Sequence, residues 1–203
     1  MTNMKEIDNF NQIKEILDFS SDDGYYFLEL IKRRKDFPAD ADVKDHEVLY
    51  TYFISSKEKL EKIETEVKTL CDLLNLRAYI NLNRKSKKKT TMLLMKECLS
   101  MIENDDYHKL KSRVDSAAGQ CNGDKATRTF LIDVDTKNPT TLEIVISSIE
   151  NVDPNVKHFI LPTVNGYHII STPFNVQEFN KLVKDENVTI KHNSPTLLYY
   201  KEK

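Results

Sequence analysis

The stretch Arg128-Thr129-Phe130-Leu131-Ile132-Asp133-Val134-Asp135 gives the strongest indication of fold in this chain. Its apolar, β-branched run favours a strand whose side chains alternate between two faces. Asp133 and Asp135 then share one face, about 6 to 7 Å apart along the strand. Burying two like charges at this spacing is unfavourable, and a divalent cation that takes oxygen ligands resolves it. The alternative is an acidic strand end that caps the next helix.

A second β-rich segment follows, in which Asn165-Gly166 separates Ile160-Leu161-Pro162-Thr163 from Tyr167-His168-Ile169-Ile170-Ser171. An Asn-Gly pair between two such runs predicts a β-hairpin. If this hairpin and the acidic strand belong to one sheet, His168 can lie beside Asp133 and Asp135. There it could contact a triphosphate or a metal-bound water, although a lone histidine on a strand can also be purely structural.

The order of these two motifs resembles the first two motifs of the archaeo-eukaryotic primase and primase-polymerase superfamily. Here they are Ile132-Asp133-Val134-Asp135 and Thr163-Val164-Asn165-Gly166-Tyr167-His168. The resemblance implies template-dependent nucleotidyl transfer, with Asp133 and Asp135 as ligands of Mg²⁺ or Mn²⁺ and His168 at the incoming nucleotide. The family's third acidic residue, on a later strand, has no counterpart in Val188-Thr189-Ile190-Lys191 or Thr196-Leu197-Leu198-Tyr199-Tyr200. Either the third ligand comes from elsewhere, or the chain is a degenerate, non-polymerising relative.

A basic segment in the first half is the candidate nucleic-acid surface. The predicted strand over residues 77–83 has an apolar face and a polar face, and the polar face is either solvated or turned toward a nucleotide or nucleic acid. A charge run follows it directly and gives a local phosphate-binding footprint. The candidate binding residues are Arg77, Tyr79, Arg84, Lys87, Lys88 and Lys89.

Composition limits the classes of protein that remain possible. The chain has 203 residues, a formal net charge of −2 and a pI near 6.2, so any nucleic-acid surface is local rather than an overall basic coat. Three widely spaced cysteines argue against a disulfide framework and a zinc site, and favour a reducing, cytoplasmic setting. Neither a membrane span nor a secretory signal is expected.

The pattern of elements predicts an α+β fold with mixed sheets and helices packed on them, and the resemblance implies a primase-polymerase-like (RRM-like) catalytic half. Residues 1–115 form the expected N-terminal α/β unit and residues 126–203 the C-terminal unit, and the two can pack as one domain. Ser55 with Glu58 predicts a helix start by a capping box, and Asn138 with Pro139 predicts another start.

A further helix is expected over residues 90–103. Its apolar positions form a stripe, which the sequence analysis assigns to the core in preference to a binding groove. The stripe consists of Met92, Met95, Leu99 and Ile102.

Three functions are compatible with these features. The favoured one is a metal-dependent nucleotidyltransferase of primase-polymerase type, with nucleic acid and a nucleoside triphosphate as partners and a separate helicase as a further partner. The second is a non-catalytic nucleic-acid-binding or replication-accessory protein. The third is a protein-interaction module.

Overall fold

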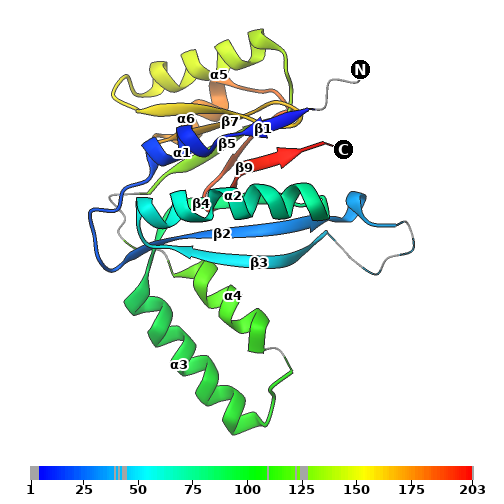
Figure 1. Ribbon diagram of the computed structural model, residues 1–203. Coiled ribbons are helices and arrows are strands. Elements are labelled where there is room, and N and C mark those ends of the chain that lie inside the picture. Colours follow the sequence, from blue (N-terminus) through cyan, green and yellow to red (C-terminus); the bar gives the residue numbers. More distant parts are fainter. Residues whose placement is uncertain are drawn as a thin grey trace.

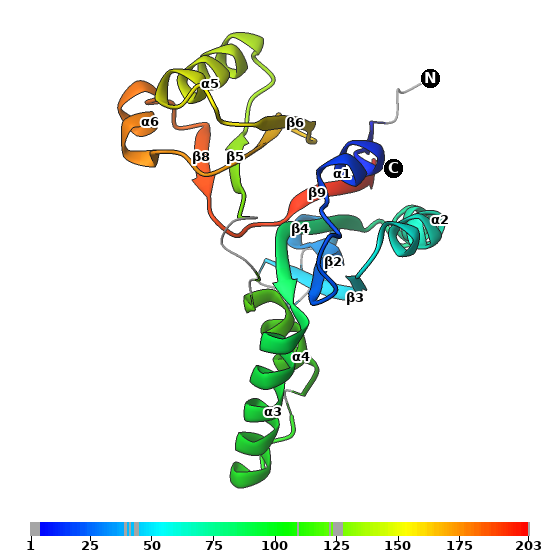
Figure 2. The same ribbon diagram turned by 90° about the vertical axis from the view of Figure 1, so that its left-hand side faces the viewer.

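The computed structural model describes residues 5–38, 40, 42, 45–108, 110–121, 123 and 128–202. Two β-sheets carry packed helices, and a helical hairpin projects away from both (Figures 1 and 2). The helices are α1 (Phe10–Ile16), α2 (Lys57–Leu74), α3 (Lys87–Asn104), α4 (Leu110–Gln120), α5 (Pro139–Val152) and α6 (Val176–Leu182), with a 3₁₀ turn at Arg34–Asp36. The strands are β1 (Glu6–Asp8), β2 (Gly24–Arg33), β3 (His46–Ile54), β4 (Arg77–Ser86), β5 (Phe130–Val134), β6 (His158–Pro162), β7 (Tyr167–Ser171), β8 (Val188–Lys191) and β9 (Thr196–Lys201).

The larger sheet has five strands in the order β1-β9-β4-β2-β3, and each neighbouring pair is antiparallel. Helices α1 and α2 cover one face, where Leu60 and Val67 of α2 share a buried core with Leu28 and Ile80 of the strands. Side chains alternate along β2, so Tyr25, Phe27 and Glu29 point to the other face. Helix α4 covers part of that face.

The smaller sheet has four antiparallel strands in the order β6-β7-β5-β8. Its chain order, β-α-β-β-α-β, is that of the ferredoxin-like split βαβ arrangement. Helices α5 and α6 cover one face, where Ile132 and Val134 are buried beside Val145 and Phe179. The opposite face carries Leu131 and, by alternation, Asp133, and it turns toward the larger sheet.

The α+β class is therefore confirmed, whereas the sheets are antiparallel rather than mixed among the described residues. The chain crosses from β5 through α5 to β6. However, β7 lies between β5 and β6 and runs antiparallel to both, so the two strands joined by the crossover are not neighbours.

The last strand connects the two halves of the chain. β9, which the sequence analysis places in the C-terminal unit, lies in the larger sheet between β1 and β4. The small sheet is thus built from residues 130–191, and the chain then returns to the first sheet. Helix α4 extends to Gln120, so part of the expected boundary at residues 116–125 is helical.

Helix starts agree with local capping rules. Asn138 caps α5 with Pro139 in the first turn, as predicted, and its side chain accepts a hydrogen bond from the Thr140 amide at 3.0 Å. The cap of α2 is Ser56 instead of Ser55, because the Ser56 hydroxyl accepts from the Lys59 amide at 3.2 Å. None of the helices in the described ranges has the length and apolar character needed to cross a bilayer.

The expected core stripe on α3 is wrong. Met92, Met95, Leu99 and Ile102 are each 60–63% exposed. Among the described residues α3 packs mainly on α4, its first turn also contacts β4 and Tyr25, and these contacts leave its outer side uncovered. Figure 2 shows the α3–α4 hairpin extending away from both sheets.

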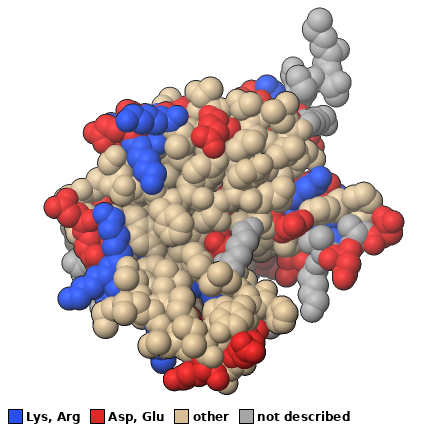
Figure 3. Space-filling model, turned by 60° about the horizontal axis from the view of Figure 1, so that its bottom comes forward, with Lys and Arg blue, Asp and Glu red and all other residues tan. Residues whose placement is uncertain are grey.

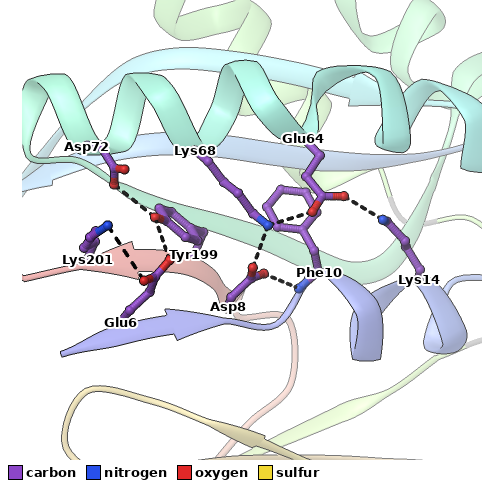
Figure 4. A network of polar contacts seen from close by, with 9 residues as sticks. All are labelled: Glu6, Asp8, Phe10, Lys14, Glu64, Lys68, Asp72, Tyr199 and Lys201. Carbon is purple, nitrogen blue, oxygen red and sulfur yellow. Dashed lines mark hydrogen bonds and ion pairs between the residues drawn. The ribbon is translucent and has the colours of Figure 1, made fainter. Parts of the chain in front are cut away.

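A polar network joins α2 to the first residues of the chain (Figure 4). The Lys68 ammonium is its centre, with Asp8 at 2.5 Å and Glu64 at 2.7 Å. It also lies 5.0 Å from the centre of the Phe10 ring, and Lys14 pairs with Glu64 at 2.6 Å. These contacts fix β1 and α1 against α2.

The buried amide of Asn9 links the two sheets directly. Its Nδ2 donates to the carbonyl of Pro162 in β6 at 3.0 Å and to the carbonyl of Leu197 in β9 at 2.8 Å. Asn9 has no exposed surface, so water cannot replace either bond.

Asn9→Ala is expected to lower the free energy of unfolding by about 2 to 3 kcal/mol, because two buried carbonyls lose their donor. Denaturant unfolding measures the change. Asn11→Ala, at an exposed position of α1, which begins directly after Asn9, is the control and should change stability little. Equal effects of the two substitutions would contradict a bridging role for Asn9.

Candidate functional site

A cavity of about 550 Å³ lies between the two sheets. Its wall is formed by strands of both sheets, by the β6–β7 turn and by the segment that precedes β9. The wall is rich in charged and polar groups of both signs. These are Glu29, Arg33, His46, Arg77, Tyr79, Asp133, Asp135, Thr163, Asn165, His168, Lys191 and Ser194.

The structure brings the two sequence motifs together in this cavity. Asp133 of β5 and His168 of β7 are directly opposite each other in the strand register. Their side chains approach to 3.4 Å between Oδ1 and Nε2. The other ring nitrogen, Nδ1, lies 2.8 Å from the Thr196 hydroxyl, so the imidazole is fixed between the two sheets.

Asp133 is buried and ion-paired. Its Oδ2 accepts a hydrogen bond from the ammonium of Lys191 on β8. Burial alone raises the pKa of the Asp133 carboxyl, but hydrogen bonds from His168 and Lys191, with their charges, outweigh burial and bring it to about 2. The carboxylate is therefore ionised near neutral pH.

Asp135 lines the same cavity in a different environment. β5 ends at Val134, and Asp135 is exposed, with its backbone amide donating to the carbonyl of Asn187 at 2.8 Å. One carboxylate is therefore buried and paired, while the other is open to solvent.

The Thr-x-x-Gly part of the second motif forms the turn that closes the β6–β7 hairpin. The Thr163 amide donates to the Gly166 carbonyl at 2.9 Å, and the Gly166 amide donates to the Thr163 hydroxyl at 3.1 Å. A Cβ on Gly166 would lie 1.9 Å from the carbonyl oxygen of Val134 and 2.8 Å from the Thr136 amide nitrogen. Glycine is thus required because the turn touches the end of the Asp-x-Asp strand.

Gly166→Ala is expected to push this turn away from β5 and to lower the free energy of unfolding by about 1 to 3 kcal/mol. Denaturant unfolding and the NMR shifts of His168 measure both effects. Gly119→Ala on α4 is the matched control, since a Cβ there meets nothing within 4 Å. An alanine at 166 that is tolerated as well as one at 119 would disprove the close contact.

The carboxylates of Asp133 and Asp135 suit a hard cation, but the ammonium of Lys191 competes with a cation for Asp133. Mg²⁺ and Mn²⁺ prefer oxygen ligands and commonly use one or two protein carboxylates, waters and substrate phosphates. Asp133 and Asp135 supply such oxygens, but Lys191 holds an oxygen of Asp133. The Lys191 side chain is 44% exposed, so it can turn away. Over the residues that the structure describes, no three His, Cys, Asp or Glu side chains form a group that could hold a metal.

Several residues of the cavity were not predicted from the sequence, among them the charged residues Glu29 and Lys191. Glu29 is a third carboxylate, which comes from β2 of the larger sheet. Burial raises its pKa, and the charge of Asp115 raises it further. The signal was available, because Glu29 is the single acid in an otherwise uncharged run, Tyr25–Ile31. Lys191 carried no comparable signal, since a lysine at a strand end is common.

Arg77 and Tyr79, both predicted to bind nucleic acid or a nucleotide, line the cavity. The guanidinium of Arg77 is 3.4 Å from the carboxylate of Asp36 and lies 4.1 Å from the centre of the Tyr200 ring. Only 2% of Arg77 is exposed, so its position is fixed by these partners.

The other predicted basic residues lie elsewhere. Arg84 is buried and its Nη1 is 3.2 Å from the carboxylate of Asp18. Lys87, Lys88 and Lys89 form the exposed first turn of α3, outside the cavity.

The polar face of β4 lines the cavity at Arg77 and Tyr79, and at Asn81 and Asn83 it is covered by the connections to the small sheet. Asn81 donates to the Asn193 carbonyl at 3.0 Å. The Asn83 side chain accepts from the Thr129 amide at 2.9 Å and donates to the His192 carbonyl at 3.3 Å. This face therefore fixes the two connections that lead into and out of the small sheet.

Comparison of the chain with protein-family models, with curated proteins and with solved structures finds no match.

Lys191→Met is expected to raise the pKa of Asp133 from about 2 toward its ordinary value of 3.8 or above. The ion pair stabilises the fold when Asp133 is ionised, so this contribution is present above the ordinary pKa and is lost as the pH falls through about 2. In the variant this contribution is absent, and Asp133 is protonated at a higher pH than in the parent chain. Carboxyl NMR titration measures the midpoint, with Lys184→Met, an exposed lysine nearby, as the control. An unchanged midpoint in Lys191→Met would show that the ion pair does not set this pKa.

Proposed function

We propose that the cavity binds a nucleoside triphosphate together with a divalent cation, and that the protein is a nucleotidyltransferase of primase-polymerase type acting on nucleic acid. One observation carries the proposal. The Asp-x-Asp strand, the Gly-x-His hairpin and the Arg77–Tyr79 segment, which are far apart in sequence, contribute to one cavity. Its volume lies within the range usual for small-molecule sites, about 300–1,000 Å³.

Each group has a chemical role in this proposal. Asp133 and Asp135 would hold Mg²⁺ or Mn²⁺, which when bound supplies charge neutralisation at the phosphates. His168 would donate from Nε2 to a phosphate oxygen in place of the Asp133 carboxylate, which lies 3.4 Å from it. Arg77 supplies a fixed positive charge, and Tyr79 supplies an aromatic face for a base.

Lys191 gives the site two arrangements. In the structure its ammonium neutralises Asp133. When phosphates enter, their charge offers Lys191 an alternative partner, and the carboxylate becomes accessible to a cation. The proposed setting is the cytoplasm, with a separate helicase as a further partner.

Asp135→Asn is expected to weaken Mn²⁺-dependent binding of a nucleoside triphosphate at least about tenfold, which corresponds to about 1.4 kcal/mol. Asp135 is exposed, so the substitution should leave the fold intact. Titration of a fluorescent nucleotide with Mn²⁺ or with a chelator measures binding, and primer extension measures catalysis. Glu143→Gln, an exposed carboxylate on the far side of the small sheet, is the control.

A non-catalytic nucleic-acid-binding protein is the second candidate. It is favoured by the engagement of both Asp133 oxygens with Lys191 and His168. Salt-sensitive nucleic-acid binding that ignores Asp135→Asn but is weakened by Lys87→Ala and Lys88→Ala would support this candidate. Nucleotide binding that is equally strong in chelator would count against the metal-dependent proposal.

A further inference from the structure

The outer side of α3 is an exposed apolar surface on the projecting hairpin. Its inner side faces α4, where Met101 is buried and Glu97 pairs with Arg113. Met92, Met95, Leu99 and Ile102 are each 60–63% exposed on the outer side; these four residues are called the α3 stripe. In Figure 3 the hairpin comes forward in the lower part of the view, and uncharged residues cover most of it. A continuous apolar row of this kind marks an interaction surface more often than single exposed apolar residues do.

The spacing of the α3 stripe is that of a coiled-coil seam. Successive members are three, four and three residues apart, which are the a and d positions of two heptads. Side chains at this spacing pack into the spaces of a facing helix, so a second helix is the partner shape that fits.

The charges of α3 indicate which helix is the partner. Lys87, Lys88 and Lys89 occupy its first turn, and Glu103 lies in its last turn, followed by Asp105 and Asp106. This distribution is unfavourable within one helix, because the amino end of a helix repels cations and the carboxyl end repels anions. An antiparallel copy of the same helix would bring each basic end to an acidic end and would oppose the two dipoles.

We infer that α3 pairs antiparallel with α3 of a second copy of this chain. In this arrangement Met92 of one copy packs on Ile102 of the other, and Met95 packs on Leu99, so the seam is self-complementary around a two-fold axis. Lys89 and Glu103 lie two heptads apart on the same flank and meet across the axis twice. A parallel pair would set the lysine clusters side by side, which is why the antiparallel arrangement is favoured.

One contact opposes the pairing. Lys96 lies on the same flank, midway between Lys89 and Glu103, and meets its own counterpart at the axis. Lys96 is exposed and its long apolar stem lets the ammonium turn outward into water. The pairing does not depend on the cavity between the sheets or on its proposed chemistry.

The mass of the full-length chain over a range of concentrations tests the inference. Sedimentation equilibrium should show a reversible dimer. Leu99→Asp, at the centre of the stripe, should raise its dissociation constant more than about tenfold. Ser100→Asp, at an exposed neighbouring position outside the stripe, adds the same charge and is the control. Circular dichroism checks that both variants keep the helical content of the parent chain.

A charge exchange tests the orientation. Lys89→Glu alone and Glu103→Lys alone should each weaken the dimer, and the double variant should restore it, because the two residues face each other only in the antiparallel pair. Restoration of the dimer in the double variant, together with a weakened dimer in Leu99→Asp, would support the inference.

Three results would overturn it. The parent chain could remain a monomer at the highest attainable concentration, or its dimer could be insensitive to Leu99→Asp. The third is failure of the double variant to restore a dimer that the single charge changes weaken.

Discussion

The amide of Asn9 holds the two sheets at a fixed separation, since one nitrogen donates to a strand of each sheet. Asn81 and Asn83 act similarly on the other side, where they hold the connections between the sheets. Because these amides are almost fully buried, their bonds are strong and poorly replaced by water. These bonds fix the two sheets at a distance that leaves a cavity between their polar faces. Two apolar faces would have packed together and left no such space.

Local patterns were sufficient to predict the strand that carries Asp133, the hairpin that carries His168 and the start of α5, whereas the pairing of Asp133 with His168 was expected only if both strands belong to one sheet. Alternation along a strand, an Asn-Gly turn and an Asn-Pro helix start each depend on neighbouring residues, and all three are present in the structure. The positions of Glu29 and Lys191 depend on which strands become neighbours. Such pairings join segments that are distant in sequence, and no local pattern specifies them.

The same limit explains why the surroundings of two surfaces, the polar side of β4 and the apolar side of α3, were not predicted correctly. An amphipathic strand or helix shows which face is apolar, but not what lies opposite either face. The polar side of β4 is covered by the segments around Thr129 and Asn193, and Lys85 on that strand is fully buried. The apolar side of α3 is uncovered, because the hairpin leaves the sheets instead of folding back onto them.

The position of β9 in the larger sheet sets an order for folding during synthesis. Glu6 of β1 pairs with Lys201 of β9, and β4 also pairs with β9. β1 and one edge of β4 therefore have no strand partner until nearly all of the described chain has left the ribosome. The small sheet is complete by Lys191 and can form earlier. The nascent chain therefore exposes an unpaired edge of β4 from the time this strand forms until β9 emerges, a state in which aggregation competes with folding and chaperones are most useful.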